Sequence, residues 1–558
     1  MGGVRTFAEL LLARAGDDHI GLRAEGLAWT WGEVVERSAR RAALLRELAT
    51  PGRPPHVGVL LENVPDYVFW IGAAALAGAA VVGINPTRRG AELAHDIRHT
   101  DCDLIVTEGR LVGLLDGLEH GVPPDRVLDI DDPGYQDLLR RHRGAEVPER
   151  PPSGEATLLL LFSSGSTGAP KAVVCSQRRL GMLAQALSVR TELARESVTY
   201  LCMPLFHGNS VMMNLAPSVY VGATVCLARR FSASGFARDV HRHRVTFVNY
   251  VGRALAYVLD RPESPEDRAS SLRLAVGTEA SVADAARFGA RFGCRVSEGY
   301  GLSEGVLRIN RTAGTPEGAL GLPVGGADVR VLDEVTGEEC PPAVRDERGR
   351  LLNADAAIGQ IVGVGLADRF EGYYKNPGAH AERVRGDDFW TGDLGYRDAD
   401  GYFYFAGRSS DRLRVDGENF AAGPVERILE RWADVSVALV YPVPDPRTGD
   451  QVMCALHLVP GGDFAPAAFA RFLDGQPDLG TKWRPRFVRL VDRVPTTGSN
   501  KVAKAGLRRA GWRTEDPVFW LPRGDDDYVL FDDTARERLE REFAEHGRAA
   551  LLPGQSGR

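Results

Sequence analysis

Short, mainly apolar runs alternate with amphipathic segments through roughly the first 330 residues of the chain. The runs that we expect to form buried strands are 157–162, 199–205, 224–228, 246–251 and 272–276. Several segments between them have the periodicity of helices, as at 282–292. Strands that are apolar on both faces must be covered on both sides. The pattern therefore predicts an α/β fold with a large N-terminal domain of layered sheets covered by helices.

The pattern changes after about residue 325, where the apolar runs become shorter and turn residues more frequent. We expect a β-rich subdomain from about 325 to 409, followed by a polar, turn-rich stretch at 409–423. Beyond it the sequence predicts a small α+β domain. Its expected elements are helices at 424–432, 465–473 and 533–547 and strands at 436–442 and 452–458. The expected domains are therefore 1–409 and 410–558.

Neither a membrane span nor a secretory signal is expected. The segment 68–84 has no charged residue, but its length is at the lower limit for crossing a bilayer. Its many Ala and Gly residues favour a buried helix that runs into a strand. The N-terminus lacks a basic region followed by an apolar one, and the seven scattered cysteines have no metal-ligand spacing. These features predict a cytoplasmic protein with reduced thiols.

Composition and charge narrow the class of partner. The 558 residues are 44% hydrophobic and 26% charged, as in soluble globular proteins. The net charge is −7, so the chain has no basic excess that would favour nucleic acid or an anionic membrane as a partner. Only five of the 68 basic residues are lysines. Because arginine carries most of the positive charge, the positions that keep lysine are candidates for a compact, mobile ammonium group.

A loop of small and polar residues, SSGSTGAP at 163–170, separates the apolar run 157–162 from Lys171. Backbone N–H groups and hydroxyls without side-chain bulk are the components of a phosphate-binding loop, and a lysine adds positive charge. The loop differs from the P-loop of NTPases, because Pro170 stands at the second glycine and Ala172 at the Ser/Thr position. On these grounds alone, a flexible surface turn is an equal alternative.

The stretch SSGSTGAPK resembles the phosphate-binding signature of the adenylate-forming superfamily, which contains acyl-CoA synthetases, luciferases and adenylation domains of peptide synthetases. Further motifs of that superfamily follow in order: MPLFHGN (203–209), EGYGLSEG (298–305), YYKNP (373–377), FWTGDLGYRDADGYFYFAGR (389–408), VDGENF (415–420) and PTTGSNKVAK (495–504). The resemblance covers nearly the whole chain. The segments RPRFVRLV (484–491) and DPVFWLPRGDDDYVLFDD (516–533) are similar to fatty-acid-transport-protein-like synthetases and to actinobacterial long-chain and steroid-type acyl-CoA ligases.

The resemblance implies an acyl-CoA ligase that uses ATP, Mg²⁺ and coenzyme A. It would convert a hydrophobic acid, either long-chain or bulky and polycyclic, to acyl-AMP and pyrophosphate, and then to the CoA thioester. The small C-terminal domain would be mobile and rotate between the two steps. Two alternatives stay open: a protein that performs only one half-reaction, and a non-catalytic nucleotide- or acyl-binding protein. The half-reaction would be thioesterification of an adenylate made elsewhere, or adenylation for a separate carrier protein.

The implied partners are a small carboxylic acid and CoA, without nucleic acid. A homodimer, a carrier protein and a partner ligase stay open as further partners.

The resemblance assigns the central chemistry to four residues. Lys171 would hold the β- and γ-phosphates, and Lys501 would offset the negative charge that builds on the α-phosphate. Glu304 would bind Mg²⁺, with Ser166 as a second metal ligand. His207 would act as a gate between the acyl pocket and the thiol tunnel. A packed histidine is the structural alternative for His207.

The nucleotide would be bound by loop residues and by residues at strand ends. The resemblance assigns this role to Ser163, Ser164, Gly165, Ser166, Thr167, Gly168, Gly277, Thr278, Glu279, Glu298, Gly299, Tyr300, Gly301, Ser303, Asp393, Tyr404 and Arg408. Among them, Tyr300 would stack on adenine and Asp393 would accept hydrogen bonds from both ribose hydroxyls, since a carboxylate has lone pairs for a vicinal diol. A simple strand-end turn at 277–280 and a hairpin with Asp caps at 392–401 are the structural alternatives.

Three further assignments depend on the same resemblance. The acyl pocket would include Met203, Met212, Val251 and Val306, which are also ordinary core residues. Gly417 and Glu418 would line the pantetheine tunnel, and Ser410 would be the hinge. Here the sequence departs from the family, which usually has Asp or Lys at the hinge and an apolar residue where Arg412 stands; Gln177 replaces a usual His. No catalytic group is lost, but the rates of the two half-reactions are in question.

Overall fold

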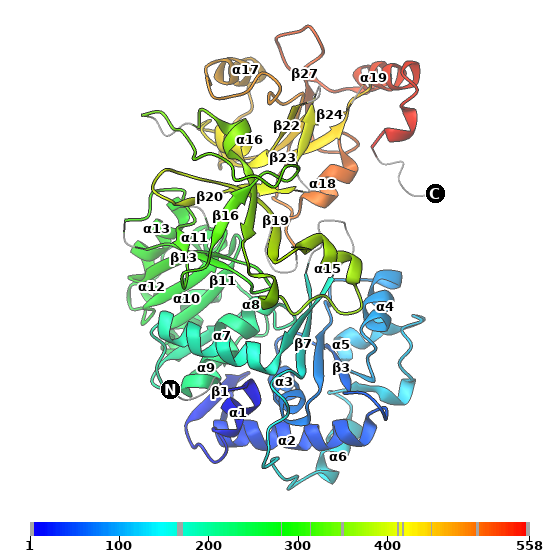
Figure 1. The fold of residues 1–558 in the computed structure, drawn as a ribbon, viewed down its shortest axis with the longest axis vertical. Helices are drawn as coiled ribbons and strands as arrows, with labels where there is room; N and C mark the ends of the chain where they lie inside the picture. The colour runs from blue at the N-terminus through cyan, green and yellow to red at the C-terminus, as the bar shows by residue number, and fades with distance from the viewer. Residues whose placement is uncertain are drawn as a thin grey trace. The chain divides into compact units, whose positions relative to one another are not determined.

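The structure is a computed structural model that describes residues 5–163, 171–280, 282–312, 314–347, 351–409, 412–415, 418–447, 449–497 and 502–553. The described chain divides into two compact units, shown as a ribbon in Figure 1. The first unit comprises described residues of 5–308 and 366–385. The second comprises those of 309–365, 386–497 and 502–553. Position 410 falls inside the second unit, and the division into domains 1–409 and 410–558 stays a prediction.

The first unit contains a six-stranded sheet with the order β6-β5-β3-β4-β7-β8. Its strands are β3 (His56–Leu60), β4 (Ala80–Gly83), β5 (Leu104–Thr107), β6 (Val127–Asp129), β7 (Thr157–Ser163) and β8 (Lys171–Ser176). All neighbours are parallel except β7 and β8, which are antiparallel. In their register Ser163 lies opposite Lys171. The two ends of the predicted phosphate loop are therefore adjacent, while residues 164–170 lie outside the described chain.

A second sheet in the first unit has the strand order β13-β12-β11-β9-β10-β1-β2. Its strands are β1 (Ile20–Ala24), β2 (Leu27–Thr30), β9 (Val198–Leu201), β10 (Thr224–Leu227), β11 (Phe247–Val251), β12 (Leu274–Thr278) and β13 (Arg295–Gly301). All neighbours are parallel except β1 and β2. The carboxyl ends of β11, β12 and β13 consequently meet at one edge, where ligands of α/β sheets usually bind.

Helices accompany both sheets of the first unit (Figure 1). They are α1 (Phe7–Leu12), α2 (Trp31–Leu48), α3 (Pro65–Ala77), α4 (Gly90–His99), α5 (Gly109–Val112), α6 (Pro133–Arg141), α7 (Gln177–Arg190), α8 (Gly208–Ser210), α9 (Ala216–Val221), α10 (Phe236–His243), α11 (Ala254–Leu259), α12 (Pro265–Arg268), α13 (Val282–Phe292) and α15 (Pro377–Arg383). Shorter elements are the 3₁₀ turns Gly113–Leu115, Pro124–Arg126 and Ala367–Arg369, the π-helical turn Val211–Leu215 and β18 (Val384–Arg385).

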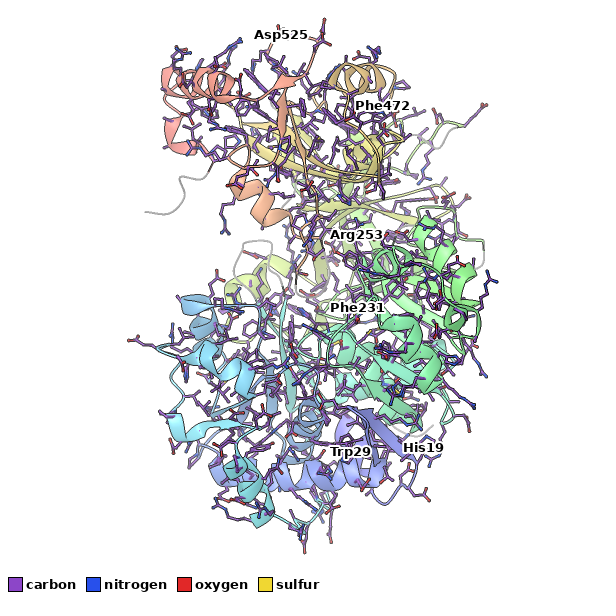
Figure 2. The ribbon with its side chains drawn as sticks, turned by 180° about the vertical axis from the view of Figure 1, so that it is seen from behind. His19, Trp29, Phe231, Arg253, Phe472 and Asp525 are labelled. Atoms are coloured by element: carbon purple, nitrogen blue, oxygen red, sulfur yellow. The ribbon has the colours of Figure 1, made fainter. Side chains whose placement is uncertain are left out.

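Helix α3 shows how small residues build the core of the first unit. A Cβ at Gly72 would lie 2.2 Å from the hydroxyl of Ser38 on α2, so glycine allows the two helices to pack closely. Trp70 on α3 and Trp31 on α2 are fully buried. Trp29, at the end of β2, packs edge to face on Phe69 of α3 with ring centroids 5.7 Å apart (Figure 2).

The second unit contains a β-rich part and an α+β part. Its strands are β14 (Arg308–Asn310), β15 (Leu322–Pro323), β16 (Val329–Leu332), β17 (Gly359–Gly363), β19 (Asp388–Arg397), β20 (Phe403–Arg408), β21 (Leu413–Val415), β22 (Glu418–Phe420), β23 (Val435–Pro444), β24 (Asp450–Leu458), β25 (Phe487–Leu490), β26 (Val518–Trp520) and β27 (Val529–Leu530). Its helices are α14 (Ala354–Ala357), α16 (Ala422–Leu429), α17 (Pro466–Asp474), α18 (Lys504–Ala510) and α19 (Asp533–Glu545), followed by the 3₁₀ turn Ala549–Leu551. Strands β16, β17, β19 and β20 pair antiparallel, and β23 to β27 form a separate sheet.

The predicted fold class is confirmed, and most predicted elements are present. The apolar segment 68–84 is the buried helix α3 followed by β4, and the helix predicted at 282–292 is α13. Strand β9 ends at Leu201, earlier than the predicted 205; beyond it the Met203 carbonyl and the Leu205 N–H bond to the side chain of Asn63 instead of to a neighbouring strand. Within the described parts of the chain, no helix combines the length and apolar character needed to cross a bilayer.

Candidate active site

Lys171 begins β8 and has a buried side chain. Only 4% of it is exposed, and its Nζ lies 2.7 Å from a carboxylate oxygen of Glu382 on α15. The same Nζ lies 5.5 Å from the ring centroid of Tyr373. The hydroxyl of Ser163 donates to the carbonyl of Lys171 (3.4 Å) across the hairpin. The lysine predicted to bind phosphate is therefore held at the base of the loop by a carboxylate and an aromatic ring.

Tyr373 links Lys171 to Glu304, the predicted metal ligand. Its segment runs beside β8, since the N–H of Tyr374 donates to the carbonyl of Ala172 (2.9 Å) and Tyr373 bridges Val173. The Tyr373 hydroxyl donates to the buried carboxylate of Glu304. Burial, and then the charge of Glu304, raise the pKa of Tyr373, so its hydroxyl stays a donor. Lys171, predicted to bind phosphate, and Glu304, predicted to bind the metal, therefore both contact Tyr373.

Arg179 on α7 fixes the loop that carries Glu304. The buried guanidinium donates to the carbonyls of Val174 (3.2 Å) and Ser303 (3.3 Å). Gly305 has φ +60°, and a Cβ there would lie 2.3 Å from Arg179 Nη2, so the tight approach needs a glycine. Sequence reasoning missed Arg179, because a single arginine on a helical pattern carries no signal.

Two predicted nucleotide-binding segments meet at the carboxyl edge of the second sheet. Gly277 on β12 lies opposite Glu298 on β13, and Tyr250 on β11 lies opposite Gly277 on its other side. A Cβ at Gly277 would lie 2.5 Å from the Tyr250 ring, so only glycine leaves room for it. The Tyr250 hydroxyl donates to Glu298, whose other oxygen accepts from the N–H of Ala280 (3.3 Å). Glu298 therefore braces this edge.

The remaining edge residues follow directly in the chain. Thr278 ends β12, and Glu279 after it has φ +73°, an uncommon value for a residue with a side chain. Gly299, Tyr300 and Gly301 complete β13. Ser303 is exposed, whereas Glu304 next to it is buried. The structure therefore brings the predicted nucleotide-binding residues Gly277 and Glu298 together, and the role of these segments stays a prediction.

In the second unit, Asp393 and Arg408 occupy paired positions on β19 and β20. Arg408 Nε lies 3.8 Å from Asp393 Oδ1. Tyr404 lies further along β20; its ring stacks on Tyr396 with centroids 4.9 Å apart, and its hydroxyl donates to Asp398 (2.9 Å). Burial, then the hydrogen bond to Asp398, raise the pKa of Tyr404 to about 12. The Tyr404 hydroxyl is thus engaged in a hydrogen bond within its own hairpin, which the sequence did not indicate.

The predicted gate and acyl-pocket residues are mostly buried. His207 is the N-cap residue of α8, and its ring lies 4.4 Å from that of Phe206. Met203 and Val251 belong to one apolar cluster, while Met212 belongs to another that includes Phe206. Val306 is also buried. The four acyl-pocket residues are therefore core residues of more than one cluster, and their role stays a prediction.

Several predicted site residues lie outside the described chain. They are Ser164, Gly165, Ser166, Thr167, Gly168, Ser410, Gly417 and Lys501. Glu418 begins β22. On either side of the predicted hinge, the Ser409 hydroxyl accepts from Gln360 (3.2 Å) and Arg412 pairs with Glu334. The departure from the family at Arg412 therefore has a structural counterpart, because an apolar residue there could not form this ion pair.

The described residues fit Mg²⁺ bound jointly with ATP. No cluster of three or more His, Cys, Asp or Glu ligands occurs in the described part of the chain. Mg²⁺ is usually held by one or two carboxylates together with substrate phosphates and waters, so no such cluster is needed. Glu304 offers the required hard oxygen ligand, with one oxygen oriented by Tyr373. Mg²⁺ bound there would offset charge on the phosphates.

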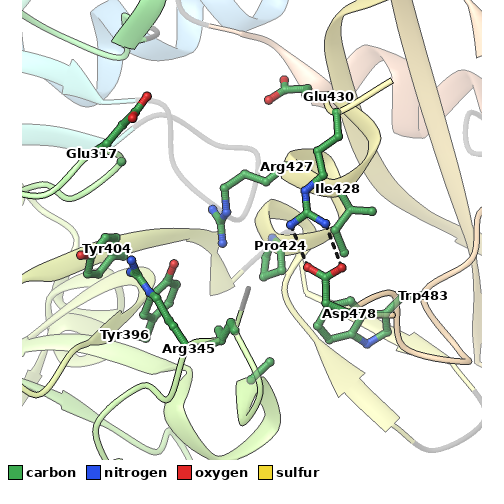
Figure 3. Close-up of a pocket in the computed structure, with 14 residues that line it drawn as sticks. Glu317, Arg345, Tyr396, Tyr404, Pro424, Arg427, Ile428, Glu430, Asp478 and Trp483 are labelled. Carbon is green, nitrogen blue, oxygen red and sulfur yellow. Dashed lines mark hydrogen bonds and ion pairs between the residues drawn. The ribbon is translucent and has the colours of Figure 1, made fainter. Parts of the chain in front are cut away.

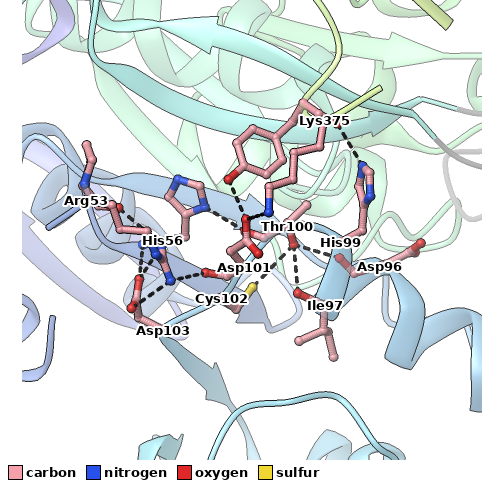
Figure 4. A network of polar contacts seen from close by, with 12 residues as sticks. Arg53, His56, Asp96, Ile97, His99, Thr100, Asp101, Cys102, Asp103 and Lys375 are labelled. Carbon is pink, nitrogen blue, oxygen red and sulfur yellow. Dashed lines mark hydrogen bonds and ion pairs between the residues drawn. The ribbon is translucent and has the colours of Figure 1, made fainter. Parts of the chain in front are cut away.

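A network behind Tyr373 anchors the YYKNP segment to the end of α4 and to the turn that follows it (Figure 4). The hydroxyl of Tyr374 donates to Asp101 Oδ2 (2.7 Å), and Lys375 Nζ lies 2.5 Å from the same oxygen. The carbonyl of Tyr374 lies 2.9 Å from His99 Nε2. Asp101 and Lys375 both have positive φ, +49° and +48°, so both ends of the ion pair are at strained positions. Burial alone would raise the pKa of Asp101, but its bonds to Lys375 and Tyr374 outweigh this and lower the pKa.

Replacing Asp101 with Asn should loosen the segment that positions Tyr373. Asn tolerates the positive φ but removes the charge that holds Lys375. We expect faster hydrogen exchange at 372–376 and an apparent ATP affinity lowered about threefold to tenfold, measured by calorimetry with Mg²⁺. Glu92→Gln, on the same helix as the network but 72% exposed, is the matched control. Unchanged exchange in Asp101→Asn would show that the network does not position Tyr373.

Comparisons with known proteins agree with this geometry. The family model described as "AMP-binding enzyme" matches residues 12–359. The chain belongs to the AMP-binding enzyme family. The resemblance to the adenylate-forming superfamily is thereby confirmed.

Members of this family are similar to the chain over nearly its whole length. It is 51% identical to "Steroid-22-oyl-CoA synthetase" of Rhodococcus jostii (strain RHA1) over 98% of this chain and 99% of that protein. It is 42% identical to "Medium/long-chain-fatty-acid--CoA ligase FadD17" of Mycobacterium tuberculosis over 93% and 99%. Among solved structures, ATP-bound MatB from Rhodopseudomonas palustris has a TM-score of 0.77 at 22% identity, over 91% and 99%. This last likeness shows the fold.

Proposed function

We propose that this AMP-binding enzyme is an ATP-dependent acyl-CoA ligase that activates a bulky polycyclic acid, a steroid side-chain acid being the best-supported class. The observation that carries the proposal is 51% identity, over almost all of both chains, to a steroid-22-oyl-CoA synthetase. The grouping of Lys171, Tyr373 and Glu304 beside the loop supports ATP chemistry. A cytoplasmic location is part of the proposal, and a homodimer or a carrier protein as partner stays open.

In the first step, a carboxylate oxygen of the acid forms a bond to the α-phosphorus of ATP, and the bond from that phosphorus to the bridging oxygen breaks. Pyrophosphate leaves with the electron pair. Lys171 binds the leaving phosphates; its ion pair with Glu382 would then exchange for phosphate oxygens. Glu304 would hold Mg²⁺, which would offset phosphate charge; Tyr373 donates to its carboxylate and Arg179 fixes the loop that carries it. Lys501 adds positive charge at the α-phosphate, and Asp393 binds the ribose.

In the second step, the CoA thiol loses its proton to solvent, and its sulfur forms a bond to the acyl carbon. The bond between that carbon and the phosphate oxygen breaks, and AMP leaves. Residues after Ser410 would rotate to open the pantetheine tunnel near Gly417 and Glu418, with His207 as the gate. We propose that the chain performs both half-reactions, because Lys171, Glu304, Asp393 and Lys501 are all present.

A panel of acids tests the substrate class. We expect kcat/KM for thioester formation to be about tenfold or more higher with a steroid-22-oic acid than with medium- or long-chain fatty acids. The reason is that a pocket shaped for fused rings leaves apolar surface uncovered when a straight chain binds. The measurement is mass-spectrometric quantification of CoA thioesters over a range of acid concentrations.

Straight-chain fatty acids are the second candidate class, favoured by the 42% identity to the FadD17 ligase. A higher kcat/KM for a fatty acid than for every steroid acid would establish this class and refute the first. Turnover of neither class, with intact thioesterification of supplied acyl-AMP, would instead favour the half-reaction alternative.

A further inference from the structure

The second unit contains a cavity of about 360 Å³, and Tyr404 is the one predicted nucleotide-binding residue among the described residues that line it (Figure 3). It lies against the stacked rings of Tyr396 and Tyr404 on one side and helix α16 on the other. Neither Asp393 nor Arg408, the predicted ribose ligands, is among its lining residues. The cavity is large enough for a small organic molecule rather than a bare ion.

Arg345 lines this cavity with a charged group that lacks an anion. Its guanidinium stacks on Tyr404, with Cζ 3.7 Å from the ring centroid. Its Nε and Nη2 atoms are buried, and neither has a hydrogen-bond partner among the described residues. No carboxylate of the described chain forms an ion pair with it. Buried N–H groups without hydrogen-bond acceptors are costly, and an anion bound at Nε and Nη2 would offset that cost.

Arg427 on α16 brings a second guanidinium to the same rings. Its Cζ lies 5.9 Å from the centroid of Tyr396, and that of Arg345 lies 5.5 Å from the same centroid. Figure 3 shows both guanidinium groups beside Tyr396 and Tyr404. Arg427 donates to the carbonyl of Phe405 (3.1 Å), which is neutral. Two positive charges beside one ring repel each other. A dianion bound between them would attract both and make the net electrostatic interaction favourable.

The acidic residues of the cavity do not neutralise this pair. Asp478 is bound by both terminal nitrogens of Arg431 (2.8 and 2.7 Å), so its charge is already matched. Glu317 and Glu430 lie at the end of the lining away from Arg345 (Figure 3). Trp483 and Ile428 add apolar walls on the α16 side. The cavity thus offers two guanidinium groups at one end and apolar surface next to them, and Arg427 also interacts electrostatically with Glu430, three residues further along the chain.

We propose that this cavity binds a small phosphate monoester, with its phosphate held by Arg345 and Arg427. A phosphate monoester carries about −1.5 to −2 charge near pH 7, which matches two guanidinium groups better than a single carboxylate does. Arginine pairs bind phosphate oxygens through charge-assisted, often bidentate hydrogen bonds. The apolar walls would cover the organic part of the ligand.

The position of the cavity in the sequence gives the ligand a regulatory consequence. Arg345 and Tyr404 precede the predicted hinge Ser410, whereas Arg427 and Trp483 follow it. A ligand that contacts both groups stabilises the arrangement in which they are adjacent. If the proposed domain rotation at Ser410 occurs, this ligand would slow it. That consequence depends on the proposed function, while the binding itself does not.

Calorimetry with phenyl phosphate tests the binding. We expect wild-type protein to bind it with a millimolar or lower Kd, and Arg345→Gln and Arg427→Gln each to weaken binding about tenfold or more. Arg330→Gln is the matched control, since its exposed guanidinium pairs with Asp328 in the same unit; we expect its Kd within about twofold of wild type. Because Arg427 is exposed on a helix, its variant should fold even if Arg345→Gln does not.

The proposal would be overturned by absence of binding to the wild type, by wild-type affinity in both arginine variants, or by displacement of phenyl phosphate by adenosine, which carries no phosphate and would place phenyl phosphate in the nucleotide site. Benzoate binding as tightly as phenyl phosphate would refute the phosphate class. A second readout is hydrogen exchange at 422–429, which should slow with phenyl phosphate in wild type but not in Arg427→Gln. These measurements need no acid, ATP or CoA, so failure of the proposed function would leave their outcome unchanged.

Discussion

Replacing Lys501 with Ala should nearly abolish adenylation while leaving thioesterification of supplied acyl-AMP within a few-fold of wild type. When the acid attacks ATP, negative charge builds on the α-phosphate oxygens, and a lysine on a mobile segment can offset it at that step alone. Losing such a charge typically costs about 3 kcal/mol, which is roughly a 10²-fold lower rate. Pyrophosphate release reports the first step, and conversion of purified acyl-AMP with CoA reports the second.

Lys504 provides a matched control for Lys501. It lies three residues further on and forms an ion pair with Glu426 of α16 (2.5 Å), which gives it a structural partner. Lys504→Ala should therefore keep adenylation within a few-fold of wild type, provided that its melting temperature shows it to be folded. Equal losses of both half-reactions in Lys501→Ala would refute the division of labour between them.

Glu304→Gln should lower the rate of adenylation about 10²-fold or more. Gln keeps the size of the side chain and can still accept the hydrogen bond of Tyr373, but it removes the charge that a hard cation needs. The Mg²⁺ concentration for half-maximal pyrophosphate release should rise. Calorimetry should show that Mg²⁺ strengthens ATP binding to wild type far more than to the variant, while ATP alone binds both alike.

Tyr373→Phe separates the charge of Glu304 from its orientation. The carboxylate stays, but it loses the hydroxyl that donates to it. We expect a smaller loss than in Glu304→Gln, about tenfold in rate, with the Mg²⁺ dependence largely kept. If Glu304→Gln bound Mg²⁺ and ATP together as well as wild type does, Glu304 would not be the metal ligand.

The layered fold was predictable because its buried strands appear in the sequence as short apolar runs. Runs such as 157–162 and 247–251 are apolar on both faces, which only a sheet covered on both sides can accommodate. The buried helix in 68–84 followed from small residues without charge. The end of β9 at Leu201 was predicted too late, because the apolar residues continue beyond the strand into a loop where they are equally buried.

The candidate site was predictable only where a motif marks it. The motifs identified Lys171, Glu304 and the strand ends at Gly277 and Glu298, and the structure brings each pair to a common location. Their grouping could not be derived from spacing, because Glu304 stands 133 positions after Lys171 in the sequence. Only the folded chain shows that Tyr373 contacts both.

Supporting residues could not be predicted from the sequence at all. Arg179 and Asp101 act through contacts with segments far away in the chain, at Ser303 and at Tyr374 and Lys375. An isolated charged residue in a helical or turn pattern most often faces solvent, so such positions give no local signal. The pair of Arg345 and Arg427 is of the same kind, since one lies in a loop and the other on α16.

The central claim is that this chain makes a CoA thioester from a hydrophobic acid by way of an adenylate. The most direct test follows pyrophosphate and CoA thioester in one sample of wild-type protein with ATP, Mg²⁺ and a steroid-22-oic acid, before and after CoA is added. We predict a single turnover of pyrophosphate without CoA, and continuous, equal production of pyrophosphate and thioester once CoA is present. Thioester formed from supplied acyl-AMP, but no pyrophosphate released with any steroid or fatty acid, would contradict the claim.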